Sequence, residues 1–122
     1  MATTTTATIN FPFGPADYQL LNAGTGTLTP AISNAKTILK YTAPAGAVTL
    51  NLSIDSELQV GAELIIYVDQ TTTGRNFTLG TGFDTEAPDL TGVASDSDVI
   101  KLVFDGTAFL AVSTWLKVVD AA

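Results

Sequence analysis

The sequence predicts an all-β fold, a β-sandwich or jelly-roll-like domain of about seven or eight short antiparallel strands with an extended N-terminal arm. Apolar and polar residues alternate with a period of two in several segments after residue 36. Turn-forming residues interrupt these segments about every 8–12 positions. Only PADYQLLNAG (15–24) suggests a helix, and that helix would have about two turns. No internal repeat of about 20–50 residues is visible.

The first 30 residues differ from the rest of the chain. We expect a single domain of 122 residues, with an N-terminal arm and irregular lead-in over residues 1–30 and a β-sandwich over residues 31–122. Four threonines occupy positions 3–6, and Pro12, Gly14 and Pro15 interrupt any regular element. GTGTLTP (24–30) is a short candidate strand. The start of the chain, MATTTTATINF, has neither the basic nor the apolar region of a signal peptide.

The strand pattern is carried by the segments KTILKYT (36–42), AVTLNLSID (47–55), LQVGAELIIYVDQ (58–70), RNFTLGTGF (75–83) and VIKLVFDGTAFLAV (99–112). Segment 47–55 alternates strictly, so one of its faces is buried and the other is wet. Segment 58–70 is apolar on both faces, which is typical of a central strand or of one that meets a partner. The expected core consists of Val48, Leu50, Leu52, Ile54, Leu64, Ile66, Val68, Phe77, Ile100, Leu102 and Phe104.

The dipeptide Asp105-Gly106 separates two alternating apolar runs and predicts a β-hairpin turn. A two-residue type I′ turn needs a positive φ at both central residues, and Asp-Gly is among the pairs best suited to it. We therefore expect Asp105 and Gly106 to form the centre of a type I′ turn.

Composition excludes several kinds of partner. Charged residues make up 14% of the chain, and twelve acidic against five basic residues give a net charge of −7. No basic patch is present to bind a nucleic acid or an anionic membrane, and no apolar run approaches the roughly 20 residues that span a bilayer. A chain with so few charges suits burial between subunits, so we expect a homo-oligomer. A monomer with a threonine-coated surface is the alternative.

The chain contains no histidine and no cysteine, which removes Ser-His-Asp and Cys-His catalysis, Cys/His zinc sites and disulfides. The remaining candidates are loop carboxylates, namely Asp84, Glu86, Asp89, Asp96 and Asp98. A pair of them about 5–10 Å apart would suit a glycosidase, and several together would suit a Ca²⁺ site. A solvated acidic loop is the favoured interpretation. We expect a protein that is not an enzyme, with no catalytic residue, no cofactor and no required metal.

Aromatic residues offer a second candidate site. Phe11, Phe13, Tyr67, Phe83 and Trp115 could stack on sugar rings, or they could fill the core of the sandwich, as large aromatic residues commonly do. The core role is favoured.

Three stretches carry a family resemblance, namely VTLNLSI (48–54), GAELIIYVDQTTTGRNFTLGTGF (61–83) and IKLVFDGTAFLAVS (100–113). Together they resemble β-domains on the surface of bacteriophage virions, where a Gly-led strand precedes a TGR-x-hydrophobic-T-hydrophobic-G-x-G-F turn and a closing DGT hairpin. The resemblance covers about residues 45–115. Ala108 departs from it, because the family pattern has a polar residue before the aromatic one.

The resemblance implies a structural virion protein, most simply a capsid decoration (cement) or auxiliary head protein, made in the host cytoplasm and assembled on the capsid surface. Its implied partners are copies of itself, with a trimer favoured, and the major capsid protein or another virion protein. A head-fibre or tail-tip adhesion module and a stand-alone carbohydrate-binding module are the alternatives. The expected interface arm contains Thr3, Thr4, Thr5, Thr6, Ile9, Phe11 and Phe13.

Overall fold

The computed structural model describes residues 17–22, 25–42 and 44–118, and residues 17–22 by their backbone alone. This part of the chain is all-β, with eleven strands and no helix. Accordingly, it holds no helix of the length and apolarity that crossing a membrane requires.

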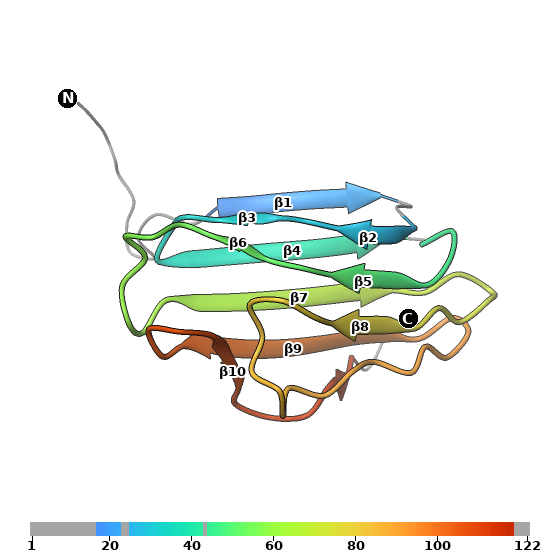
Figure 1. The fold of residues 1–122 in the computed structure, drawn as a ribbon. Helices are drawn as coiled ribbons and strands as arrows, with labels where there is room; N and C mark the ends of the chain where they lie inside the picture. The colour runs from blue at the N-terminus through green and yellow to red at the C-terminus, as the bar shows by residue number, and fades with distance from the viewer. Residues whose placement is uncertain (1–16, 23–24, 43, 119–122) are drawn as a thin grey trace.

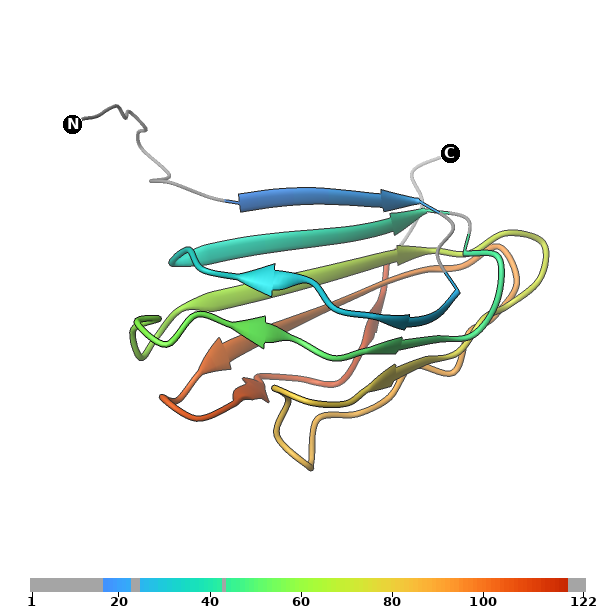
Figure 2. The same cartoon turned by 45° about the horizontal axis from the view of Figure 1, so that its top comes forward.

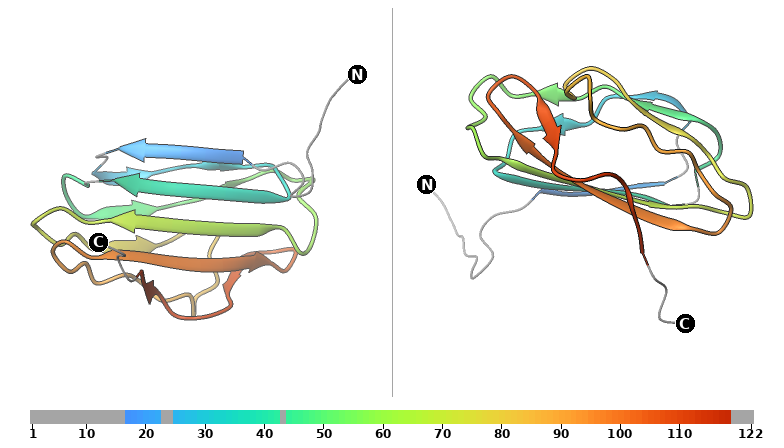
Figure 3. Two further views of the ribbon diagram at one scale, coloured as in Figure 1. Left: turned by 180° about the vertical axis from the view of Figure 1, so that it is seen from behind. Right: turned by 90° about the horizontal axis from the view of Figure 1, so that it is seen from below.

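The strands form two layers (Figures 1 and 2). Sheet A has six strands: β1 (Asp17–Asn22), β4 (Lys36–Thr42), β7 (Glu63–Asp69), β9 (Ser97–Phe104), β10 (Phe109–Ala111) and β11 (Leu116–Lys117). The second layer, here called sheet B, contains β2 (Gly26–Leu28), β5 (Val48–Leu50) and β8 (Phe77–Leu79), and the pair β3 (Ala31–Ile32) and β6 (Ser53–Ile54). Seen from below in Figure 3, the two layers face one another.

The chain winds between the layers as a flattened coil. In sheet A, β1, β4 and β7 are parallel neighbours. In sheet B, β2, β5 and β8 are parallel neighbours, and β3 pairs in parallel with β6. Each pass along sheet A is therefore followed by a return along sheet B. β9 ends this pattern, because it runs antiparallel to β7 and receives β10 and β11 on its other side.

The expectation of antiparallel strands is therefore wrong for most of the pairings. Five of the eight strand pairs are parallel, and antiparallel pairing is confined to the neighbours of β9. Parallel strands need a crossover connection, and here a strand of the opposite sheet supplies it. Within the first 30 residues, β1 and β2 pair with β4 and β5, so residues 17–22 and 26–28 belong to the sheets.

The structure shows a short internal repeat that is not evident in the sequence. GTLTPAI (26–32), VTLNLSI (48–54) and FTLGTGF (77–83) lie side by side in sheet B. Thr27 is in register with Thr49, and Thr49 with Thr78. The leucine after each threonine points into the core, where Leu50 is buried and Leu28 and Leu79 are partly buried. The repeat is only a few residues long and its two spacings are unequal, so it does not stand out in the sequence.

The core fills the space between the two layers. Ten of the eleven predicted core residues are buried there, and Ile54 is half-buried against them. The alternation did not reveal seven further members, although Phe83 among them was expected in the core as a large aromatic residue: Ile32, Leu39, Tyr41, Ala62, Phe83, Leu90 and Phe109. Alternation continues through Asn51 and Leu52, so β5 and β6 together behave as the single strand predicted over residues 47–55.

Two hydroxyl groups are buried on the inner face of β4 without a hydrogen-bond partner, the Oγ1 of Thr37 and the phenol of Tyr41. The Tyr41 ring packs against Phe77 at 5.3 Å between ring centroids. Burial raises the pKa of the Tyr41 phenol above its ordinary value, because the phenolate would lose its hydration.

Replacing Tyr41 by phenylalanine should raise the free energy of unfolding at pH 7 by about 1 kcal/mol, because an unpaired buried hydroxyl is removed. Above about pH 10 the unfolded state releases the phenol proton while the folded state retains it, so stability falls as pH rises. Tyr41→Phe should reduce this fall. Urea unfolding at pH 7 and pH 11 measures both effects, with Tyr67→Phe as the control at a more exposed ring. Equal losses at pH 11 in wild type and Tyr41→Phe would contradict the assignment.

Candidate functional site

The outer face of sheet A is the most distinctive surface of the described chain. Alternate residues of β4, β7 and β9 point away from the core, and they are opposite one another in register. Figure 3 presents this sheet in its left-hand view. We define the outer face by its apolar members Ile38, Ile65, Tyr67, Val99, Val103, Leu110 and Leu116 and its charged members Lys36, Lys40, Glu63, Asp69 and Lys101.

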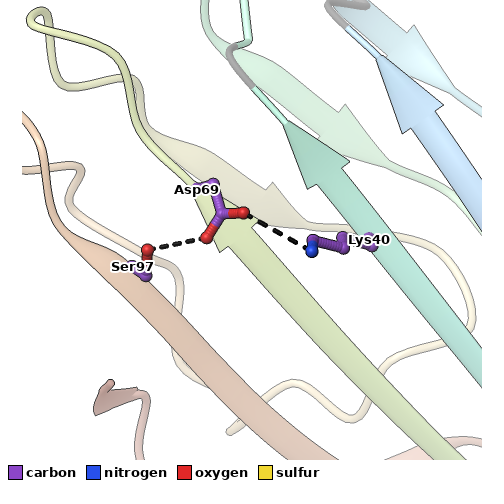
Figure 4. Close-up of polar contacts among 3 residues, drawn as sticks. All are labelled: Lys40, Asp69 and Ser97. Carbon is purple, nitrogen blue, oxygen red and sulfur yellow. Dashed lines mark hydrogen bonds and ion pairs between the residues drawn. The ribbon is translucent and has the colours of Figure 1, made fainter. Parts of the chain in front are cut away.

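Four of the five charged residues on the outer face form ion pairs. Lys40 Nζ lies 3.8 Å from Asp69 Oδ2, and the Oγ of Ser97 donates a hydrogen bond of 2.6 Å to Asp69 Oδ1, so three neighbouring strands meet at one carboxylate (Figure 4). Lys101 Nζ lies 3.6 Å from Glu63 Oε2. These side chains are between a third and a half exposed, so each pair contributes at most about 1 kcal/mol to stability. Their main effect is that the charged side chains interspersed among the apolar residues of this face neutralise one another.

The outer side of sheet B is different in character. Its strand positions carry small, uncharged residues: Thr27, Thr29, Ala31, Asn51, Ser53, Thr49, Thr78, Gly80 and Gly82. Asn51 serves the coil itself, because its Oδ1 accepts a hydrogen bond of 2.8 Å from the backbone N–H of Thr81. This side therefore offers hydroxyl groups and backbone, with little apolar area.

The five candidate carboxylates do not converge. Asp84 accepts a hydrogen bond from the N–H of Glu86, and Asp89 from the N–H of Leu79, so both hold local backbone in place. Asp96 forms an ion pair with Lys117 at 3.2 Å. Partial burial, followed by repulsion from Asp96, raises the pKa of Asp98, while Lys117 lowers it. Among the side chains that the structure describes, in residues 25–42 and 44–118, no three acidic groups gather in a way that could hold a metal ion.

Calcium should leave the melting temperature unchanged. A ligand that binds only the folded state raises it by mass action, and the carboxylates of Asp84, Asp89 and Asp96 each take part in a separate local contact. Thermal unfolding in millimolar Ca²⁺ and in EDTA is the measurement. A rise of several degrees in Ca²⁺ would show that these loops bind the ion after all.

The candidate sugar-stacking residues are also separated. Phe83 is buried in the core. Trp115 is half-buried, and its indole N–H donates a hydrogen bond of 2.8 Å to the carbonyl of Pro88. Tyr67 lies on the outer face of sheet A, 37% exposed. Phe11 and Phe13 lie outside the described residues, as do the other members of the expected arm, Thr3 to Thr6 and Ile9.

Asp105 and Gly106 lie between β9 and β10, which pair in antiparallel fashion with Phe104 opposite Phe109. The two central residues of the turn are Gly106 and Thr107, because the N–H of Asp105 donates to the carbonyl of Ala108. Gly106 has a φ of 103°, and Thr107 has no positive φ. The type I′ assignment is therefore wrong, and a single positive φ at the first central position is typical of type II′.

Asp105 acts as a cap for this turn instead of occupying its centre. Its Oδ1 accepts hydrogen bonds from the N–H groups of Thr107 at 2.7 Å and Ala108 at 2.8 Å. The bond from Ala108, followed by that from Thr107, lowers the pKa of the Asp105 carboxyl, because both stabilise the charged form.

Replacing Gly106 by valine should lower the free energy of unfolding by about 1–2 kcal/mol, since a β-branched residue resists a positive φ. A Cβ at this position would also lie 3.3 Å from Val60 Cγ2. Thr107→Val is the matched control, because it places the same side chain at the next turn position without a positive φ. Urea unfolding of both variants gives the comparison, and an equal effect would rule out backbone strain as the cause.

A shallow cavity of about 270 Å³ lies at one end of the coil, lined by Ser33, Ala35 and residues 57–62. Glu57 is its only charged lining residue, and Val60 at its rim is 72% exposed. This lining supplies no set of converging polar groups that would orient a small molecule.

Sequence reasoning missed the cross-strand contacts of Lys40, Asp69 and Ser97, because they depend on which strands are neighbours. The outer face itself could be inferred in part. Residues 63–69 were predicted to be apolar on both faces, and their outward-pointing apolar residues lie on the outer face of sheet A. Comparison of the chain with protein-family models, with curated proteins and with solved structures finds no significant match.

Proposed function

We propose that the protein is a non-enzymatic structural component of a bacteriophage virion, a capsid decoration (cement) or auxiliary head protein that coats the shell. The observation that carries the proposal is that the distinctive groups of the described chain lie on broad sheet faces, while its carboxylates and aromatic rings are dispersed. A protein of this kind acts through surfaces. The motif resemblance over residues 45–115 supplies the virion context.

Two further features support this role, the layered architecture and the low share of charged residues. The two facing layers make a sandwich-like body with few charges, suited to close packing between subunits. In the proposal the protein is oligomeric, with a trimer implied by the resemblance, and residues 1–13 reach a neighbouring subunit or the shell. Its partner on the shell is the major capsid protein, and its location is the capsid surface.

Co-sedimentation tests the proposal directly. Purified protein is mixed with heads of the encoding phage that were assembled without it, and separately with isolated tails. We expect saturable binding to heads and greater resistance of the coated heads to heat. Binding to tails alone would replace the decoration role with that of an adhesion module, and binding to neither would overturn the virion role.

A further inference from the structure

The outer face of sheet A leaves several large apolar side chains exposed to solvent. Its centre is formed by Tyr67, 37% exposed, which is in register with Val99, and Val99 in turn with Leu116, 55% exposed. Leu110 extends the same face at 38% exposure. Tyr67, Val99 and Leu116 thus form an exposed apolar cluster bordered by polar residues, which marks an interaction site. A central aromatic residue is typical of a protein–protein interface.

The charge of the outer face points to a second copy of this chain as the occupant. Its three lysines and two carboxylates give it a net charge of +1. The whole chain carries −7, so the remainder carries −8. Two copies therefore repel one another when they meet through the acidic parts of their surfaces. On the outer face of sheet A, opposite charges can pair between copies as they do within one. The uncharged side of sheet B lacks the apolar residues that would drive contact.

We infer that copies of this chain pack against one another through the outer face of sheet A. Four strand positions about 4.8 Å apart and seven residues at about 3.3 Å each give a face of roughly 450 Å² in projection. Two such faces approach the lower limit of about 1,000 Å² for a specific interface before side-chain relief is added. The inference names the surface that would form the oligomer of the proposed function, but it does not require the role at the capsid.

Two symmetric arrangements bury the face. In a pair, the two outer faces pack about 10 Å apart, as stacked sheets do. In a trimer, three faces line a prism around a three-fold axis. A side about 19 Å wide lies about 5.5 Å from that axis, close to half of the usual separation of packed sheets. Both arrangements place Tyr67 near the symmetry axis.

Light scattering coupled to size-exclusion chromatography tests the inference on the full chain. We expect wild type to have two or three times the monomer mass. Tyr67→Glu and Leu116→Glu should each reduce it to the monomer mass, because a buried unpaired carboxylate would face its own copies. Val93→Glu is the matched control, since Val93 is 54% exposed and lies outside the outer face. Circular dichroism checks that each variant remains folded.

A cross-linking experiment keeps the inference testable if a glutamate variant fails to fold. The chain has no cysteine, so a single introduced thiol can form disulfides only between copies. Under mild oxidation Tyr67→Cys should give a covalent dimer, and Val93→Cys should remain mostly monomeric. A monomeric wild type, an unchanged mass in both glutamate variants, or equal cross-linking at the two positions would overturn the inference. Head binding by a monomeric Leu116→Glu would leave the capsid role intact.

Discussion

Replacing Phe77 by alanine should lower the free energy of unfolding by about 3–5 kcal/mol, the usual cost of emptying a large aromatic site in a core. Phe77 is fully buried on β8, and its ring packs against Tyr41 of β4 in the opposite sheet. Its backbone exchanges hydrogen bonds of 3.0 and 2.9 Å with Leu90. The side chain therefore connects both layers and the loop that follows β8.

Urea unfolding at pH 7 measures this effect. Val93→Ala serves as the control, because Val93 is 54% exposed and its truncation should cost less than about 0.5 kcal/mol. A loss below about 1.5 kcal/mol for Phe77→Ala would mean that the two layers are not packed together at this ring.

Replacing Gly92 by alanine should be the most damaging single-methyl change in the described chain, with a loss of about 3 kcal/mol or failure to fold. A Cβ on Gly92 would collide with the backbone of Arg75, and a Cβ on Gly74 would collide with the backbone of Gly92. Two loop segments thus cross with their main chains in contact. The N–H of Gly92 also donates a hydrogen bond of 3.0 Å to Asn76 Oδ1.

Gly46→Ala is the matched control for Gly92→Ala. The Cβ of that variant would meet the side chain of Thr25, which can rotate away, whereas the backbone of Arg75 cannot. We expect Gly46→Ala to cost less than about 1 kcal/mol. Thermal and urea unfolding of both variants decide the question, and similar stability of the two would show that the loop crossing is loose.

The type of secondary structure could be predicted because it is a local property. In residues 36–42 every second side chain is buried, and the same period continues through residues 48–52 and 63–69. That period distinguishes a strand from a helix without any knowledge of neighbours. The eleven predicted core residues follow from the same pattern. Ile54 alone among them is only half-buried, at the end of its strand.

Strand order could not be predicted in the same way. The short connection between β4 and β5 is compatible with a hairpin, but it carries the chain across the core to the other sheet. A strand that pairs beside its predecessor and one that packs opposite it show the same alternation. The choice between them depends on long-range contacts.

The cross-strand chemistry depends on tertiary context, whereas the turn geometry depends on a local side-chain interaction that the dipeptide pattern did not reveal. Asp69 meets Lys40 and Ser97 because β4 and β9 flank β7. In the turn, the local pair Asp105-Gly106 suggested one geometry. The side chain of Asp105 selected another by accepting two backbone hydrogen bonds.

The sequence by itself determined that this protein is an all-β domain with a central strand that is apolar on both faces. It could do so because the alternation of apolar and polar residues is a local property of the chain. Only the tertiary structure decided that its strands coil in parallel, that its carboxylates are dispersed and that the outer face of sheet A joins apolar residues to paired charges. These features require residues that are far apart in the sequence, such as Lys40 and Val99, to share one surface through Tyr67 of β7. Neighbouring strands of sheet A are separated in the sequence by a strand of sheet B. No local pattern therefore encodes the register between them.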